Sequence, residues 1–130
     1  MATILIIDDS ESIREMLRHY LEEAGYDVAV AVDGDEGLVL FRRAPAELVI
    51  TDIFMPNREG LDVIKELRRD FPEVKIIAIS GGGIVGVREE TTMELLAIAR
   101  EFGASCTFAK PFHLNDILIT VNELLGPKNA

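Results

Sequence analysis

A single aspartate, Asp52, lies between two apolar runs in the stretch TDIFMP, at residues 51–56. The run before it, residues 48–50, reads as a buried strand, where a carboxylate is costly unless a neighbouring charge pairs with it. Asp52 is therefore either a buried group held by such a charge or a residue that takes part in chemistry. A carboxylate can attack phosphorus and form an aspartyl phosphate, which makes Asp52 a candidate nucleophile.

Four more polar residues follow apolar runs in the same way: Asp8, Asp9, Ser80 and Lys110. Taken singly, each has an ordinary structural explanation, because such residues cap helices, form turns or carry a solvated charge. The order of the predicted elements favours a functional explanation, since it brings all four residues to the same edge of a sheet as Asp52.

The sequence alternates apolar runs of strand length with segments in which apolar residues recur at helical spacing. The predicted strands cover residues 3–7, 28–31, 48–53, 74–80 and 106–109, and a predicted helix follows each of them. This alternation indicates a doubly wound α/β fold whose five-stranded parallel sheet is covered on both faces by five helices. The strand order 2-1-3-4-5 fits best and places chemistry at the carboxyl ends of strands one, three, four and five.

Three carboxylates at that edge would repel one another, and a divalent cation would relieve the repulsion. Oxygen ligands suit a hard ion such as Mg²⁺, and the absence of Cys and His from the set argues against zinc. Asp8 and Asp9 form the pair expected of metal ligands, which leaves Asp52 as the nucleophile. Lys110 would hold phosphate oxygens as a point cation, the Ser80 hydroxyl would donate to them, and Gly81 would let its backbone approach closely.

Length and composition narrow the class of protein. The chain has 130 residues, of which 48% are hydrophobic, and we expect one globular domain over residues 1–126 with a short tail at 127–130. The net charge of −10 disfavours nonspecific nucleic-acid binding. The apolar clusters are too short for a membrane span, and the single cysteine excludes an internal disulfide. We also expect no secretory leader, because the sequence does not open on a basic stretch followed by an apolar one. We therefore expect a cytoplasmic protein without membrane or nucleic-acid partners.

The stretches IIDDS, TDIFMP with GLDVIKELR after it, IIAISGG and AKPF resemble the motifs of the two-component response-regulator receiver domain, over residues 3–125. The resemblance implies a flavodoxin-like receiver fold in which Asp52 is the phosphoacceptor. The phosphoryl group would come from a histidine of a sensor kinase or of a histidine phosphotransfer protein. With no output domain expected after residue 126, the chain resembles a stand-alone, chemotaxis-type receiver. Such a protein is a signalling phosphoacceptor that catalyses only its own phosphorylation and dephosphorylation.

The resemblance also assigns roles to other residues. It implies that Asp8, Asp9, Asp52 and the backbone carbonyl of Phe54 hold Mg²⁺. It implies that Ser80 and Lys110 contact the phosphoryl group. Finally, it implies a cis peptide bond between Lys110 and Pro111 that turns Lys110 into the site, and a switch face made by the fourth helix, fifth strand and fifth helix.

The sequence departs from the family pattern in three places. Thr107 stands where the family usually has an aromatic switch residue, and the neighbouring Phe108 should point to the opposite face of the sheet. The segment at residues 81–92 is longer than usual and rich in glycine, which fits either a mobile loop beside the site or a tolerated surface insertion. Phe54 is bulky where it can lean over the phosphoryl group, and we expect it to alter the lifetime of the acyl phosphate.

Two other functions compete with this interpretation. One is a receiver-like interaction module that works without phosphorylation, although the complete set of site residues disfavours it. The other is a phosphatase of the haloacid dehalogenase type, which places a second aspartate two residues after the first; here that position is Phe54. Among the remaining residues, we expect Met16 to pack in the core, and neither His19 nor His113 to lie in the site.

Overall fold

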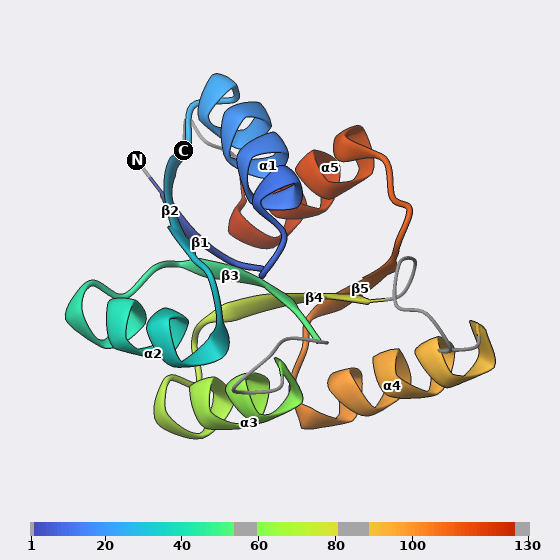
Figure 1. Ribbon diagram of the computed structural model, residues 1–130. Helices are drawn as coiled ribbons and strands as arrows, with labels where there is room; N and C mark the ends of the chain where they lie inside the picture. The colour runs from blue at the N-terminus through green and yellow to red at the C-terminus, as the bar shows by residue number, and fades with distance from the viewer. Residues whose placement is uncertain (1, 54–59, 81–88, 127–130) are drawn as a thin grey trace.

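The structure, a computed structural model, describes residues 2–53, 60–80 and 89–126. Its middle layer is a parallel sheet with the strand order β2-β1-β3-β4-β5 (Figure 1). The strands are β1 (Thr3–Ile7), β2 (Asp27–Ala31), β3 (Leu48–Asp52), β4 (Lys75–Ser80) and β5 (Cys106–Ala109). The predicted fold class and strand order are confirmed, and the predicted strands differ from these only at their ends.

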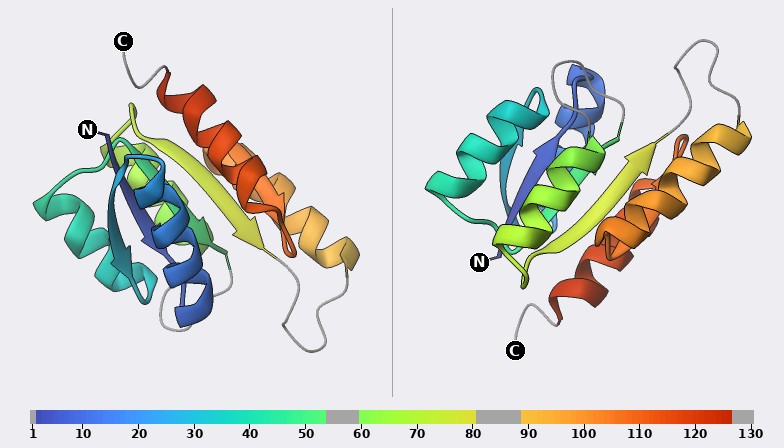
Figure 2. Two further views of the ribbon diagram at one scale, coloured as in Figure 1. Left: turned by 90° about the horizontal axis from the view of Figure 1, so that it is seen from above. Right: turned by 90° about the horizontal axis from the view of Figure 1, so that it is seen from below.

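Helices cover both faces of the sheet, with α1 and α5 on one side and α2, α3 and α4 on the other (Figure 2). They are α1 (Glu11–Glu23), α2 (Gly34–Arg43), α3 (Gly60–Asp70), α4 (Glu89–Phe102) and α5 (Leu114–Leu125). Successive residues of β1 point to opposite faces, so that Ile4 and Ile6 pack under α1 and α5 while Leu5 and Ile7 pack under the other helices. Burial on both faces explains the continuous apolar run at residues 4–7.

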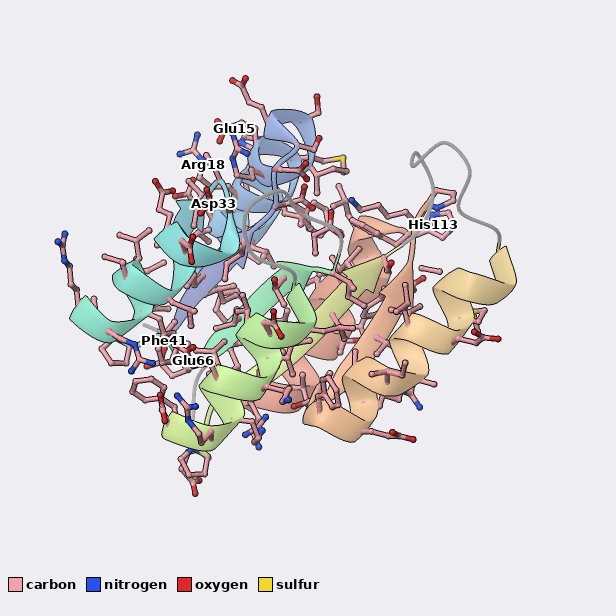
Figure 3. All side chains as sticks on the ribbon, turned by 60° about the horizontal axis from the view of Figure 1, so that its bottom comes forward. Glu15, Arg18, Asp33, Phe41, Glu66 and His113 are labelled. Atoms are coloured by element: carbon pink, nitrogen blue, oxygen red, sulfur yellow. The ribbon has the colours of Figure 1, made fainter. Side chains whose placement is uncertain are left out.

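Ion pairs and aromatic rings join the carboxyl-terminal ends of α2 and α3. Arg42 donates to the carboxylates of Glu66 and Asp70, each at 2.7 Å. The rings of Phe41 and Phe71 meet edge to face with their centroids 4.7 Å apart. Figure 3 shows Phe41 and Glu66 at this seam, which fixes α2 against α3 at the end of the molecule away from the carboxyl ends of the strands.

One packing prediction was wrong, because Met16 is 41% exposed and does not belong to the core. The face of α1 that packs on the sheet is formed by Leu17 and Leu21, which are buried, together with Ile13, which is partly buried. Met16 precedes Leu17 by one position, and a helix turns about 100° per residue. Its side chain is therefore rotated out of the contact.

Gly60, the first residue of α3, lies against the backbone at the end of β3. Its N–H donates to the carbonyl oxygen of Ile53 at 2.9 Å. A Cβ atom on this residue would lie 2.0 Å from the carbonyl oxygen of Asp52 and 2.7 Å from the Cα of Ile53. Both neighbours are backbone atoms, so a side chain here would displace the strand that carries Asp52.

We therefore expect Gly60→Ala to lower the free energy of unfolding by about 1–3 kcal/mol or more, as overpacking does. Urea unfolding measures this change. Gly37→Ala is the comparison variant, because the three atoms nearest to its Cβ, at 2.4, 2.8 and 3.4 Å, all belong to the side chain of Ile7 and none to the backbone. Alanine also favours a helix by about 1 kcal/mol over glycine, so we expect Gly37→Ala to lose less stability than Gly60→Ala. Equal stability of Gly60→Ala and the wild type would contradict the close approach of α3 to β3.

Candidate functional site

Three charged side chains from three different strand ends converge at the carboxyl edge of the sheet. The Lys110 Nζ lies 3.0 Å from the Oδ2 of Asp52 and 3.4 Å from the Oδ2 of Asp8. Asp8 follows β1, Asp52 ends β3 and Lys110 follows β5. The two carboxylates are buried, at 2% exposure for Asp8 and 5% for Asp52, and the lysine side chain is 15% exposed. The predicted convergence of these residues on one site is therefore observed.

The protein environment shifts the proton affinities of Asp8 and Lys110. Burial raises the pKa of Asp8, and the neighbouring Asp9 adds to the rise, against the opposing effects of the Ser10 N–H and Lys110. Burial alone would lower the pKa of Lys110, but the attraction of Asp52 and Asp8 outweighs it and raises the pKa. Lys110 is therefore a cation at neutral pH. It is one positive charge facing two buried carboxylates, so negative charge is in excess.

The three predicted acidic ligands suit a hard divalent cation. Asp8, Asp9 and Asp52 each present a carboxylate oxygen, and these oxygens lie within 4.8 Å of one another. Two of the acids are buried and Asp9 is exposed, so the cluster has a side open to solvent, where Mg²⁺ keeps its waters. The excess negative charge at the site also favours a dication, because the ion would relieve the repulsion between the carboxylates. The fourth predicted ligand, the carbonyl of Phe54, lies outside the described residues.

Ser80, at the end of β4, carries a buried hydroxyl that none of the described residues binds. The residue is 0% exposed, and its Oγ has no hydrogen-bond partner among the residues that the structure describes. Its own carbonyl oxygen accepts a 2.7 Å hydrogen bond from the N–H of Lys110, which links the ends of β4 and β5. An unpaired buried hydroxyl is costly, so Ser80 is suited to donate to an anion that binds beside it. Gly81, the other predicted phosphate contact, lies outside the described ranges.

Thr107 and Phe108, where the sequence departs from the family's aromatic switch residue, lie on opposite faces of β5. The Oγ1 of Thr107 accepts a hydrogen bond of 3.3 Å from the Nε of Arg100 on α4. Phe108 packs in the cluster on the opposite face, beside α1 and α5. The prediction that these neighbours point to opposite faces is confirmed, and so is the cis peptide bond between Lys110 and Pro111. Of the long segment predicted at residues 81–92, residues 81–88 lie outside the described residues and residues 89–92 form the start of α4.

Two residues that support the site were not predicted. The guanidinium of Arg14, on α1, donates to the carbonyl oxygen of Asp8 at 2.7 Å. Gly60 lies against the backbone of Asp52. Each contact joins parts of the chain whose proximity depends on the folded backbone. The sequence signals are an arginine five positions after Asp9 and a glycine just before the apolar residues that mark a predicted helix.

The strand order, the acidic cluster and its lysine together define an α/β receiver-type domain. A family model described as the response regulator receiver domain matches residues 4–122, and the chain belongs to this family. Among solved structures, the chemotaxis protein CheY4 of Vibrio cholerae is similar, with a TM-score of 0.81 and 30% identity over 95% of this chain and 98% of that one. A response regulator receiver domain protein from Clostridium thermocellum has a TM-score of 0.84 and 29% identity, over 96% of this chain and 94% of that one.

Curated relatives match this chain over only part of their own length. The probable transcriptional regulator ycf27 of Porphyridium aerugineum is 36% identical over 94% of this chain and 47% of its own length. The PhoP transcriptional regulatory protein of Bacillus subtilis, named for alkaline phosphatase synthesis, is 31% identical over 94% of this chain and 48% of its own length. The chain thus spans about half the length of these relatives. The expectation of no nucleic-acid partner concerned this chain alone and does not fit regulators of transcription at full length.

The helices of the structure bear on the expectation that the chain does not span a membrane. Within the described ranges, none of the helices combines the length and apolar character that crossing a bilayer requires.

Because charge repulsion and burial both work against the Asp8 carboxylate, we expect Asp8→Asn to raise the melting temperature in EDTA by a few degrees. Added Mg²⁺ should stabilise the wild type more than this variant, since the variant has lost one ligand. Thermal unfolding with and without Mg²⁺ measures both effects. Asp27→Asn, at an exposed position at the start of β2, is the control and should change neither. A variant that gained as much stability from Mg²⁺ as the wild type would exclude Asp8 as a ligand.

The unpaired hydroxyl of Ser80 gives a second prediction. Ser80→Ala should raise the free energy of unfolding by about 1 kcal/mol, because the variant no longer buries a hydroxyl that has no partner among the described residues. Ser105→Ala is the control, since the Ser105 Oγ accepts a 3.3 Å hydrogen bond from the N–H of Ile76 and its loss should be destabilising. Chemical denaturation of the two variants decides the matter. A destabilised Ser80→Ala protein would show that this hydroxyl has a structural partner.

Proposed function

We propose that this chain is a phosphoacceptor of a two-component system, in which Asp52 receives a phosphoryl group from a phosphohistidine. The observation that carries the proposal is the 3.0 Å contact between the Lys110 Nζ and a carboxylate oxygen of Asp52. The site also presents the buried carboxylate of Asp8, the exposed carboxylate of Asp9 and the Ser80 hydroxyl, for which the described residues supply no hydrogen-bond partner. The donor would be a sensor histidine kinase or a histidine phosphotransfer protein, as is usual for the family.

In the proposed reaction, a carboxylate oxygen of Asp52 forms a bond to phosphorus while the bond between phosphorus and the imidazole nitrogen breaks. The electron pair of the broken bond stays on the imidazole, and Asp52 becomes an acyl phosphate. Lys110 would turn from the carboxylate toward a phosphoryl oxygen and neutralise part of its charge. The Ser80 hydroxyl would donate to another oxygen and so gain the partner that it lacks among the described residues.

Mg²⁺ would be held by Asp8, Asp9 and Asp52, together with the carbonyl of Phe54. When bound, it supplies charge neutralisation for the phosphoryl oxygens during transfer and hydrolysis. The residues of this chain supply the rest: Asp8 and Asp9 place the ion beside the nucleophile, and burial of Asp52 restricts water around it. The proposed activity is limited to phosphorylation and dephosphorylation of the chain itself.

The proposed consequence of phosphorylation is a shift between two arrangements of the face made by α4, β5 and α5. Two contacts of the described residues support this route. The backbone carbonyl of Ser80, at the end of β4, accepts a hydrogen bond from the N–H of Lys110, and Thr107 on β5 is hydrogen-bonded to Arg100 on α4. A backbone rearrangement at Ser80 on phosphorylation would act through the first contact on the end of β5, and the second contact joins β5 to α4. The output would pass to a protein partner or, in a longer protein like the relatives, to a further region.

Incubation with acetyl phosphate tests the phosphoacceptor directly. Intact-mass measurement should show a gain of one phosphoryl group that requires Mg²⁺ and is absent from Asp52→Asn. Asp62→Asn, at an exposed aspartate of α3, is the matched control and should be labelled like the wild type. Labelling that persists in Asp52→Asn would place the modification elsewhere. A complete lack of labelling of the wild type would favour the alternative, an interaction module that works without phosphorylation.

A further inference from the structure

Arg14, near the start of α1, binds the turn after β1 that carries Asp8 and Asp9, two of the predicted metal ligands. One guanidinium nitrogen, Nη1, donates to the carbonyl oxygen of Asp8 at 2.7 Å. Side chains of a helix lean toward its amino terminus, so an arginine near the start of α1 is well placed to reach back over this turn. The side chain is half-buried. A charged donor at this distance makes a stronger hydrogen bond than a neutral one.

The rest of Asp8 is already fixed by other contacts. Its N–H donates to the carbonyl oxygen of Ala31 at 3.2 Å, which extends the pairing of β1 with β2. Its Oδ1 accepts from the N–H of Ser10 at 2.8 Å, and its Oδ2 accepts from Lys110 at 3.4 Å. The hydrogen bond from Arg14 therefore adds little to the position of the Asp8 carboxylate itself. Its effect must be on the next residue of the chain.

The carbonyl that Arg14 holds belongs to the peptide group that joins Asp8 to Asp9. A peptide group is planar and rigid, so fixing its oxygen and the Cα of Asp8 also fixes the direction in which the Cα of Asp9 lies. Asp9 itself is exposed, whereas Asp8 is buried, so the packing that holds the Asp8 side chain is lacking around Asp9. Its place beside Asp8 and Asp52 thus depends on the backbone of this turn.

We infer that Arg14 is a positioning residue for the divalent cation site, acting through the peptide group to hold the Asp9 carboxylate toward Asp8 and Asp52. The inference rests on the proposed function only in taking the three acids as the cation site. It assigns to Arg14 no contact with the cation or with the phosphoryl group. Its role is to place an otherwise exposed ligand before the cation arrives, which reduces the ordering that binding requires.

The affinity for Mg²⁺ in the absence of any phosphodonor tests this inference. Calorimetric titration should show that Arg14→Met weakens Mg²⁺ binding by about tenfold, the lower end of what is seen when groups supporting metal ligands are removed. Arg14→Lys should recover part of the loss, because its amine can donate to the same carbonyl but lacks the guanidinium geometry. Arg18→Met is the matched control one turn further along α1, since Arg18 pairs with Glu15 and Glu22 and not with the site. Figure 3 shows Arg18 beside Glu15.

A double-mutant cycle separates positioning of Asp9 from a general effect on the fold. In an Asp9→Asn background, Arg14→Met should cost much less Mg²⁺ affinity than it does in the wild type, because its effect passes through Asp9. Unchanged affinity in Arg14→Met, or a loss of the same size in both backgrounds, would overturn the inference. If Arg14→Met proves poorly folded by circular dichroism, the comparison of Arg14→Lys with the wild type in both backgrounds decides it. If the Mg²⁺ affinities change as expected but acetyl phosphate does not label the protein, the proposed phosphoacceptor function is rejected. The role of Arg14 at the cation site is then retained.

Discussion

The ammonium group of Lys110, between the carboxylates of Asp8 and Asp52, is the interaction on which the site depends. These contacts join residues that are 102 and 58 positions apart in the chain. They require β1, β3 and β5 to end at the same edge of one parallel sheet, which the observed strand order provides. One cation cannot balance two buried carboxylates and the neighbouring Asp9. The excess negative charge is what makes a divalent cation fit the site.

Backbone contacts hold these charges in place. Gly60 brings the start of α3 against the end of β3, and the N–H of Lys110 binds the carbonyl of Ser80. Arg14 holds the peptide group that joins Asp8 to Asp9. The site is thus built from strand ends whose neighbours are fixed by hydrogen bonds and close packing. Of its side chains, that of Ser80 has no hydrogen-bond partner among the described residues.

The fold and most of the site could be predicted because the relevant signals are local. Continuous apolar runs identified strands buried on both faces, and the polar residue ending each run gave Asp8, Asp52 and Ser80. Strand alternation likewise placed Thr107 and Phe108 on opposite faces. Met16 was wrongly predicted because helical spacing defines the packed face only to within about one residue. The roles of Arg14 and Gly60 could not be seen, since they depend on contacts with backbone atoms brought near only by folding.

The location of a bound divalent cation tests most directly whether these charges form one site. Crystals of the protein grown with Mn²⁺ in place of Mg²⁺ would give an anomalous difference peak from the ion. We predict a peak within bonding distance of carboxylate oxygens of Asp8, Asp9 and Asp52, with the Lys110 ammonium beside it. A well-ordered site with no peak there at millimolar Mn²⁺, or with the ion held by other residues, would contradict the account.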